Sequence, residues 1–434
     1  MAPTPGKTAL VLAGGGLTGA VYEIGALRAI DDLLVDRTVN DFDIFVGTSA
    51  GALVAAMLAA GFSPGLMLDV MNEEHPEIAP IRRGDIFPID PAGLLQSTVR
   101  FPRKLLAAWS AYVQQGRGDT TLFDLLWQLL ELLPPGLYDG AGLERYVRRV
   151  LKQANVSNRF GDLERQLYII ATDLDNGERA VFGAGYDEQA TISQAVAASA
   201  AMPFLYKPVR IGQREYVDGG LRGNASLDLA IEQGAKLVVC INPVVPFDSE
   251  GGESVLRRDR ADGHISDRGV QAVTSQVLAI LLHSGLHYHV KQLRRRYPDV
   301  DIILVEPRAD DEHMHFDNIM RYSARLTIAR HGFESVTLYL AQDFAHYKEI
   351  LTRHGIPVSR RLLVEEMQEI WDSDYSPRVL RRILSARQPS ERPASRIYTE
   401  LDETLCRLEE ALARLDAKVR RAGSAAAPAD GTAS

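Results

Sequence analysis

Cysteine is scarce in this sequence, with two residues among 434. Cys240 lies in the apolar run "KLVVCINP" and Cys406 in a leucine-rich stretch. Isolated cysteines in such surroundings are usually buried thiols, so neither a disulfide nor a reactive pair is expected. Sparse cysteine of this kind suits a reducing compartment.

Long hydrophobic runs are also missing. No apolar stretch of the sequence reaches the roughly 18 residues that a membrane-spanning helix needs. The segment "TALVLAGGG" near the start is too short for the hydrophobic region of a signal peptide, and it ends in glycines. We therefore expect a cytoplasmic protein that touches membranes only peripherally, while export without a cleaved signal peptide stays open.

The chain has no surplus of positive charge. Its 48 lysines and arginines are outnumbered by 57 aspartates and glutamates, which gives a formal net charge of −9. Nucleic-acid-binding proteins normally carry a basic face, and the sequence contains no Lys/Arg-rich block and no nucleic-acid motif. Nucleic acid is therefore not an expected partner. With 46% hydrophobic residues, the chain can instead bury a large core.

Strand-like and helix-like segments alternate along the chain. Short apolar runs bounded by turns predict strands at 8–12, 43–46, 167–172, 179–182, 208–211, 214–217, 236–241 and 301–305. Helical patterns lie between them, at 17–34, 50–60, 140–152, 191–200, 224–234 and 270–296. Such alternation predicts an α/β fold with a mainly parallel central sheet that is covered by helices on both faces.

The predicted organisation has one α/β domain followed by helical extensions. The domain spans 7–310, and the later segments are a helical region (311–385), a linker (386–396), an amphipathic heptad-like helix (397–421) and a disordered tail (422–434). The heptad-like helix either docks on its own domain or pairs two chains into a homo-oligomer.

Residues 62–139 form an insertion of the α/β domain. Within it, the segment 100–133 carries Trp109, Tyr112 and Trp127, which are amphipathic rings of the kind found at lipid–water boundaries. Two interpretations stay open for this segment. It is either a lid that opens at a lipid surface or a set of helices that cap the core.

A candidate nucleophile lies in the sequence Gly47-Thr48-Ser49-Ala50-Gly51. This G-x-S-x-G pattern directly follows a predicted strand and leads into a predicted helix, which is the context of a nucleophile elbow. The sharp turn holds the serine in a strained backbone state, and the small residues at Gly47 and Gly51 let the turn close. The hydroxyl of Ser49 is then exposed at the carboxyl end of the sheet.

A serine nucleophile needs a base, and none of the ten histidines follows a strand in a glycine-rich loop. His283 and His287 lie four apart on a predicted helix, but the glutamate of the zinc-binding H-E-x-x-H pattern is missing, which favours packing over metal binding. Asp218 fits better, because Asp218-Gly219-Gly220 follows a predicted strand. A partly desolvated aspartate can accept the serine proton.

Three consecutive glycines end the first predicted strand. Gly14, Gly15 and Gly16 can turn their amides inward without Cβ clashes, at the start of a helix, and could stabilise the oxyanion formed during acyl transfer at Ser49. The alternative is a dinucleotide loop of the G-x-G-x-x-G type, with acidic residues downstream at positions 31, 32 and 36. A serine elbow after the next strand, where a ribose-binding acid would be needed, favours the oxyanion loop.

Together these motifs resemble the patatin-like phospholipase family. The resemblance spans residues 7 to 305 and is carried by the glycine loop, the elbow at Ser49, the segment "ASAAMPFLYKPV" (198–209) and the D-G-G at Asp218. It implies a three-layer α/β/α fold, a Ser-Asp dyad, and hydrolysis of phospholipids or other acyl-ester lipids without a metal or another cofactor.

The glycine loop departs from the family pattern at one position. Family members usually carry Arg or Lys where this chain has Thr18. The amide donors stay intact, but a cation near the loop is lost. This departure motivates the alternative function, a catalytically silent protein that binds lipids or partners on the same scaffold.

Overall fold

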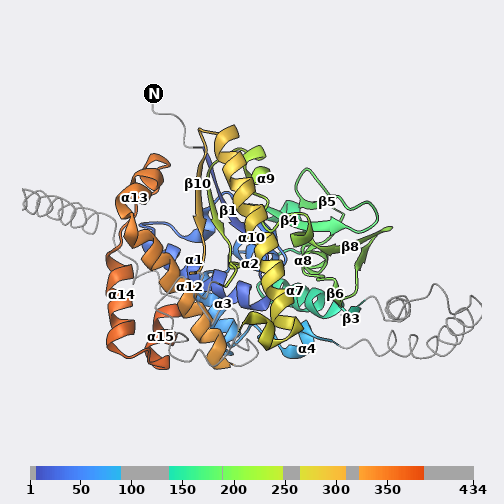
Figure 1. Cartoon of the computed structure of the whole chain (residues 1–434), viewed down its shortest axis with the longest axis horizontal. Coiled ribbons are helices and arrows are strands. Elements are labelled where there is room, and N and C mark those ends of the chain that lie inside the picture. Colours follow the sequence, from blue (N-terminus) through green and yellow to red (C-terminus); the bar gives the residue numbers. More distant parts are fainter. Residues whose placement is uncertain (1–5, 89–135, 188, 248–263, 309–321, 386–434) are drawn as a thin grey trace, which may run out of the picture.

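The structure is a computed structural model that describes residues 6–88, 136–187, 189–247, 264–308 and 322–385. The segment 100–133, the predicted linker 386–396, the heptad-like helix 397–421 and the tail 422–434 therefore lie outside the described residues. The described chain forms one central sheet with helices on both sides (Figure 1).

The predicted strands are confirmed. The central sheet has the order β10-β9-β1-β2-β4-β8-β7, and β5 pairs with β4. Its strands are β1 (Lys7–Leu12), β2 (Ile44–Thr48), β4 (Gln166–Asp173), β5 (Arg179–Gly183), β7 (Val209–Ile211), β8 (Arg214–Asp218), β9 (Ala235–Ile241) and β10 (Asp301–Val305). The run from β10 to β4 is parallel, whereas β5, β8 and β7 are antiparallel to their partners.

Side chains alternate between the two faces of the sheet, as the pleat of a strand requires. On β1, Leu10 and Leu12 pack into one core together with the helices that cover the first face, while Ala9 and Val11 pack into the second core. The first face is covered by α1 (Gly16–Leu33), α2 (Ala50–Ala59), α3 (Pro64–Met71), α7 (Ala141–Gln153), α8 (Ile192–Ser199) and the C-terminal helices. The second is covered by α9 (Leu227–Glu232) and α10 (Val270–Arg296). The three-layer α/β/α fold is confirmed.

The register of β4 brings two strand ends together. Thr48 at the end of β2 pairs with Ile170, and Asp218 at the end of β8 pairs with Ala171, the next residue of β4. β5 pairs with β4 over residues that also pair with β2 and with β8, so it must lie on the opposite edge of β4 from both of them. β2 and β8 therefore lie along the same edge of β4. β2 is parallel to β4 and β8 is antiparallel to it. The carboxyl ends of β2 and β8 therefore meet.

Some elements differ from the sequence prediction. The helix predicted at 224–234 is shorter, because Asn224 is held in a loop by the hydrogen bond that its carbonyl accepts from the Gly14 amide. A small two-stranded sheet of β3 (Gly136–Tyr138) and β6 (Phe204–Tyr206) was not predicted, since three residues are too few to show an alternating pattern. The short helix α4 (Arg83–Ile86) was not predicted either.

The C-terminal helices pack directly on α1. They are α12 (Tyr322–Gln342), α13 (Phe344–Arg353), α14 (Arg361–Asp372) and α15 (Pro377–Leu384). α1 and α12 approach closely at Gly25, where an added Cβ would lie 1.9 Å from the Ala329 carbonyl oxygen. On the same helix, the buried ion pair of Arg28 with Asp32 also reaches α15, because Arg28 donates to the Ile383 carbonyl at 3.0 Å.

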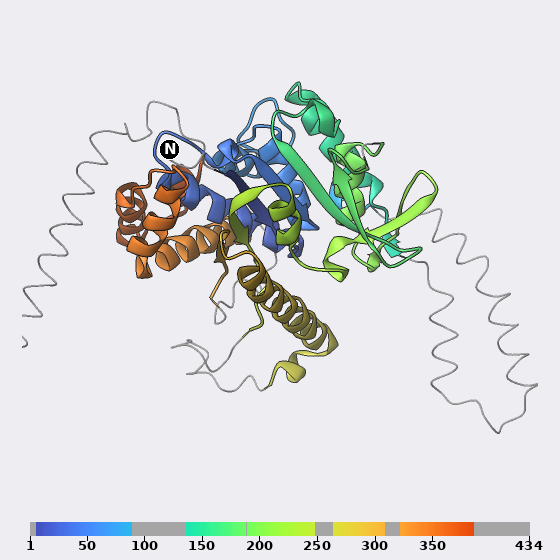
Figure 2. The same cartoon turned by 90° about the horizontal axis from the view of Figure 1, so that it is seen from above.

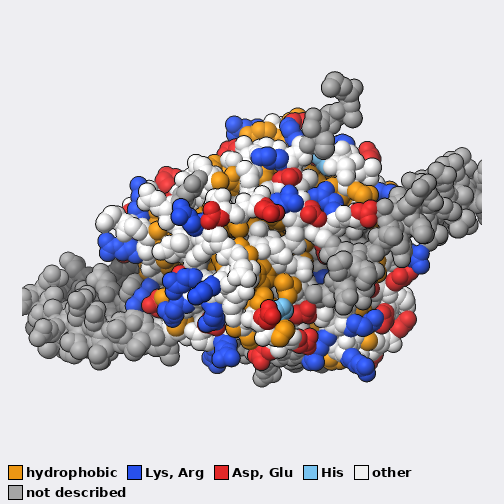
Figure 3. All heavy atoms as spheres, turned by 180° about the vertical axis from the view of Figure 1, so that it is seen from behind, with side chains coloured by type: hydrophobic (Ala, Val, Ile, Leu, Met, Phe, Trp, Pro, Cys, Tyr) orange, Lys and Arg blue, Asp and Glu red, His pale blue; other side chains and the backbone are white. Residues whose placement is uncertain are grey.

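The surface carries charges of both signs. The face opposite to that of Figure 1 shows acidic and basic side chains interspersed, with hydrophobic side chains gathered near the middle (Figure 3). No single helix among the described ranges has the length and apolar composition to cross a membrane. One bent pair, α2 with α3 at an angle of 118°, passes that test when taken together.

Candidate active site

The elbow at Ser49 has the predicted backbone geometry. Ser49 lies between β2 and α2 with φ 55° and ψ −121°, a backbone conformation that residues other than glycine rarely adopt. The neighbouring glycines make the turn sterically feasible. A Cβ on Gly47 would lie 2.5 Å from the Gly51 carbonyl oxygen, and a Cβ on Gly51 would lie 2.4 Å from the Leu12 carbonyl oxygen. The elbow therefore packs its backbone against the end of β1.

Asp218 is in hydrogen-bond contact with Ser49. The Ser49 Oγ donates to Asp218 Oδ2 at 2.5 Å, while Oδ1 accepts from the Gly220 amide at 2.8 Å. A Cβ on Gly219 would lie 2.3 Å from the Ile170 carbonyl oxygen, so this glycine permits the chain to turn tightly beside β4. The meeting of β2 and β8 on β4 thus places the two predicted residues side by side.

Burial sets the proton affinity of Asp218. Asp218 is only 8% exposed, and this desolvation raises the pKa of its carboxyl group to about 6, partly offset by the hydrogen bonds from Ser49 and the Gly220 amide. At neutral pH the carboxylate is therefore mostly ionised, yet it is a much stronger base than an exposed aspartate. Such a group can accept a hydroxyl proton and return it.

Sequence reasoning missed the role of Ser199. This buried residue at the end of α8 accepts a hydrogen bond from the Ser49 amide at 2.8 Å and donates one to the Ile170 carbonyl at 2.5 Å. Its hydroxyl therefore ties the strained elbow to β4. The segment "ASAAMPFLYKPV" contains Ser199, but a serine among alanines carries no signal that separates this role from simple helix packing.

The glycine loop faces the serine. A Cβ on Gly14 would lie 3.2 Å from the Ser49 Cβ and 2.8 Å from the Asn224 Oδ1, so only glycine fits there. Its own amide already donates to the Asn224 carbonyl at 3.1 Å, which removes it from the predicted set of three oxyanion donors. Within the described ranges, the amides of Gly15 and Gly16 donate to no acceptor. They stand at the N-terminus of α1, whose dipole favours negative charge.

The dinucleotide alternative finds no support in this geometry. Asp31 accepts a hydrogen bond from the Val39 amide at 3.0 Å, and Asp32 is paired with Arg28 inside the core. Pro243 also packs over the loop, since a Cβ on Gly15 would lie 2.5 Å from the Pro243 Cγ. Two of the three acidic residues that could have bound a ribose, Asp31 and Asp32, are thus used to hold the fold together.

An apolar cavity of about 60 Å³ begins beside the loop and the elbow. Leu17 follows Gly16 directly, and Leu53 lies one helical turn after Ser49 on α2; both line the cavity. It extends between α1, α2, α3 and α7, and its remaining lining consists of Ala20, Ile24, Val54, Met57, Phe62, Met67, Val70, Met71, Ile81, Tyr146 and Val150. Such a lining suits a hydrocarbon chain.

The site and fold define an α/β/α protein in which an elbow serine contacts an aspartate beside a glycine loop. A family model described as patatin-like phospholipase matches residues 10–231, about half of the chain. The chain belongs to the patatin-like phospholipase family, as its motifs predicted. Membership in this family supports lipid hydrolase activity.

Individual relatives are distant. The uncharacterized protein YqhO of Bacillus subtilis is 26% identical over 260 residues, which cover 57% of this chain and 74% of that protein. A cGAMP-activated phospholipase of Pseudomonas aeruginosa is 24% identical over 231 residues, covering 52% of this chain and 56%, just over half, of that protein's length. The crystal structure of VipD from Legionella pneumophila is similar at 16% identity with a TM-score of 0.34, covering 78% of this chain and 67% of that chain.

Proposed function

We propose that this protein hydrolyses acyl esters of lipids, of the phospholipase A, lysophospholipase or carboxylesterase type, through a dyad of Ser49 and Asp218. The observation that carries the proposal is the 2.5 Å hydrogen bond between Ser49 Oγ and the buried Asp218 carboxylate. A serine in a strained elbow with a base in contact is the arrangement that nucleophilic catalysis requires. The apolar cavity beside it supports a lipid acyl chain as the group that is transferred.

In the first half-reaction, Ser49 Oγ attacks the ester carbonyl carbon and passes its proton to Asp218. The negative oxygen of the tetrahedral intermediate accepts hydrogen bonds from the Gly15 and Gly16 amides. Collapse of the intermediate breaks the bond to the leaving alcohol, which takes the proton from Asp218. Ser49 then carries the acyl group as an ester.

In the second half-reaction, a water molecule attacks the acyl-enzyme and gives a proton to Asp218. The second tetrahedral intermediate is held by the same two amides. Its collapse releases the fatty acid and returns the proton to Ser49. Each proton that Asp218 accepts is given back within one turnover, so a single carboxylate serves as base and acid.

The pH dependence of the reaction should follow Asp218. The carboxylate must be ionised to accept the serine proton, and burial raises its pKa to about 6. We expect kcat/KM to be constant above pH 7 and to fall about tenfold per pH unit well below pH 6. The measurement is a pH–rate profile on a soluble short-chain ester. A fall of kcat/KM that begins only near pH 4 would argue against Asp218 as the base. So would a fall near pH 6 that disappears when a histidine is replaced.

The apolar cavity should set the preferred acyl chain length. Met57 lines it from α2, and a tryptophan there would fill the space that a chain occupies. Each methylene that is shut out costs about 0.8 kcal/mol of binding. We expect Met57→Trp to lower the ratio of kcat/KM for a C16 ester over a C4 ester by about tenfold or more, which follows from losing two methylenes. The volume-conserving Met57→Leu should leave that ratio within about twofold. An unchanged ratio in Met57→Trp would place the acyl chain elsewhere.

Exposed apolar side chains lie close in the chain to Asp218 and to Ala201, whose carbonyl accepts the Asp218 amide at 3.0 Å, and they support contact with a lipid surface. The Phe204 side chain is 90% exposed, and its backbone has a φ of 69°. In the sequence, Phe204 comes shortly after the end of α8. Leu221, 59% exposed, comes three residues after Asp218, and Met202 and Leu205 are exposed beside Phe204. Large apolar groups gathered at one site usually serve binding. We propose that this rim, formed by Met202, Phe204, Leu205 and Leu221, rests on the lipid surface from which the substrate is drawn.

The rim is tested with substrate in two physical states. Burying a phenylalanine is worth about 1.5–3 kcal/mol. Phe204→Ser should therefore lower hydrolysis of phospholipid in vesicles by about tenfold or more and leave hydrolysis of a soluble short-chain ester unchanged. Val364→Ser removes a 51% exposed apolar side chain on α14 and serves as the control. Equal losses on both substrates in Phe204→Ser would assign Phe204 to the site itself.

The proposed function is tested directly by product analysis. The purified full chain is incubated with phosphatidylcholine, lysophosphatidylcholine and a short-chain ester, and the products are identified by mass spectrometry. We expect free fatty acid from at least one of the lipids. Folded protein that binds phospholipid vesicles but releases no fatty acid from any of the three would favour the silent, lipid-binding alternative that Thr18 motivates.

A further inference from the structure

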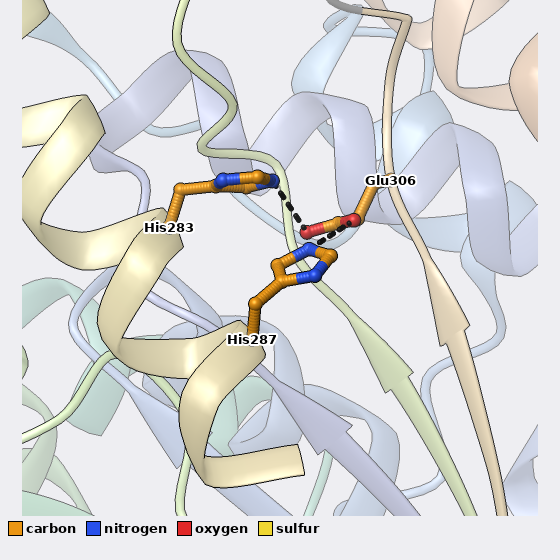
Figure 4. Close-up of side chains that lie close together, drawn as sticks. All are labelled: His283, His287 and Glu306. Atoms are coloured by element: carbon orange, nitrogen blue, oxygen red, sulfur yellow. Dashed lines mark hydrogen bonds and ion pairs between the residues drawn. The ribbon is translucent and has the colours of Figure 1, made fainter. Parts of the chain in front are cut away.

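His283 and His287, which the sequence pattern assigned to packing, converge on a carboxylate. The two histidines lie one turn apart on α10, and Glu306 follows the last residue of β10 (Figure 4). His287 Nε2 lies 2.8 Å from Glu306 Oε2, and His283 Nε2 lies 3.5 Å from Glu306 Oε1. The two imidazole rings are 4.2 Å apart between centroids. Sequence analysis found no glutamate within the helix because the third group lies just after a distant strand, β10.

These separations suit a small divalent ion. In a tetrahedral zinc site with bonds of about 2.0–2.2 Å, neighbouring ligand atoms lie about 3.3 Å apart. The two His–Glu separations of 2.8 and 3.5 Å bracket that value, and the three potential ligand atoms all lie within 4.8 Å of one another. Two imidazoles and one carboxylate are also a ligand set that zinc takes in proteins, with a fourth position left for water. Small side-chain adjustments would complete the geometry.

The carboxylate is held from behind by a buried amide. Asn242, which is fully buried, donates from Nδ2 to Glu306 Oε1 at 2.7 Å. Asn242 Oδ1 accepts from Asn224 Nδ2 at 2.9 Å, and the Asn224 carbonyl accepts the Gly14 amide. Partners of this kind fix the orientation of metal ligands. Through the side chain and the backbone carbonyl of Asn224, hydrogen bonds therefore connect the His–Glu cluster with the glycine loop.

The cluster stands where α10 leaves the body of the protein. From Leu286, which lies between the two histidines, toward the C-terminus, the buried side chains Leu286, Val290 and Leu293 pack against the sheet. Before it, Val277 and Leu281 are exposed, and the N-terminal part of the helix projects from the body (Figure 2). Among the described residues, few apolar side chains in this part of α10 are buried. A metal ion between α10 and the end of β10 would fasten the helix at that boundary.

We propose that His283, His287 and Glu306 bind one divalent transition-metal ion of the zinc class, which clips α10 to β10 and steadies the hydrogen-bond chain to the glycine loop. The ion takes the place of the direct contact between His287 Nε2 and Glu306 Oε2. It acts on the structure and takes no part in the acyl transfer at Ser49. The proposal is thus independent of the proposed hydrolase activity.

The site is tested by metal binding to the full chain. Chelator-treated protein is titrated with Zn²⁺ against a chromophoric chelator, and a stoichiometry of one tight site is expected. His287→Ala and Glu306→Gln should each weaken binding at this site by at least about 100-fold. His289→Ala is the matched control, because His289 lies on the same helix but faces Asp228, 3.5 Å from its Oδ1, and it should bind as the native chain does.

A second measurement distinguishes stabilisation by a metal ion bound at this site from a general effect of the ion on folding. Zn²⁺ should raise the melting temperature of the native chain and of His289→Ala, and leave that of His287→Ala unchanged. Bound Co²⁺ should give the intense visible absorption of a four-coordinate ion in the native chain. That absorption should be lost in variants that lack His283 or His287. A native chain that binds neither ion tightly, or a double variant His283→Ala/His287→Ala that still binds one equivalent, would overturn the proposal.

Discussion

Replacing Ser49 by alanine is expected to lower kcat by about 10⁴-fold or more, because no other group can form the acyl-enzyme. Replacing Asp218 by asparagine keeps the shape of the site but removes the base, and we expect a loss of at least about 10²-fold. Since the two side chains act as one unit through their 2.5 Å hydrogen bond, the double variant should be little worse than Ser49→Ala alone. The measurement is turnover of one soluble ester by all three variants.

Loss of folding would mimic loss of chemistry, so stability is measured in parallel. The folded state binds the Asp218 proton more tightly than the unfolded chain, because its pKa of about 6 exceeds the usual value near 3.9. That contribution to stability is present at low pH and is lost as the pH rises from about 4 through 6. Asp218→Asn should therefore melt no lower than the native chain at pH 8. Asp299→Asn is the control variant, because it makes the same chemical change at an exposed aspartate paired with Lys236. It should leave the turnover rate unchanged. Native rates in Asp218→Asn would contradict the dyad.

Replacing Gly51 by alanine is expected to destabilise the fold by about 3 kcal/mol or more, at the upper end of overpacking costs. The new Cβ would lie 2.4 Å from the Leu12 carbonyl oxygen and 2.7 Å from that of Ala13, and neither backbone atom can move without shifting β1. Because a displacement of about 1 Å at a reacting group can cost 10²-fold in rate, activity should fall by at least that factor even in the molecules that remain folded. Denaturant unfolding and turnover measure the two effects.

Gly285 provides the opposite control for the same chemical change. It lies inside α10, and a Cβ there meets nothing within 4 Å. Gly285→Ala should stabilise the protein by up to about 1 kcal/mol, because alanine loses less conformational freedom in a helix. If Gly51→Ala unfolded at the same denaturant concentration as the native chain, the close contact between the elbow and β1 would be wrong.

Local patterns were enough to predict the strands of the central sheet and the two residues of the proposed dyad. Ser49 and Asp218 each carry a signal within a few residues, namely a strand, a tight turn and glycines that allow it. Their contact depends on something no local pattern contains: the opposite directions of β2 and β8 along one edge of β4. Sequence could place both residues at strand ends, but their approach was an inference from the need for a base.

The parts that sequence reasoning missed depend on partners far along the chain. Gly14 looks like an oxyanion donor from its neighbours, yet its amide donates to the backbone carbonyl of Asn224, which lies far along the chain. Ser199 supports the elbow through two hydrogen bonds that only the packed sheet defines. Glu306 completes the cluster with His283 and His287 from a different element. In each case the residue type permits several roles, and the tertiary contact selects one.

The most direct test of the central claim is labelling with a fluorophosphonate probe, mapped to the modified residue by mass spectrometry. The probe reacts with serines that a neighbouring base has activated, and its adduct places an oxyanion-like oxygen near the Gly15 and Gly16 amides. The account predicts one adduct, on Ser49, whose rate of formation falls by at least about 10²-fold in Asp218→Asn. A folded native chain that stays unlabelled, or that is labelled at another residue, would contradict it.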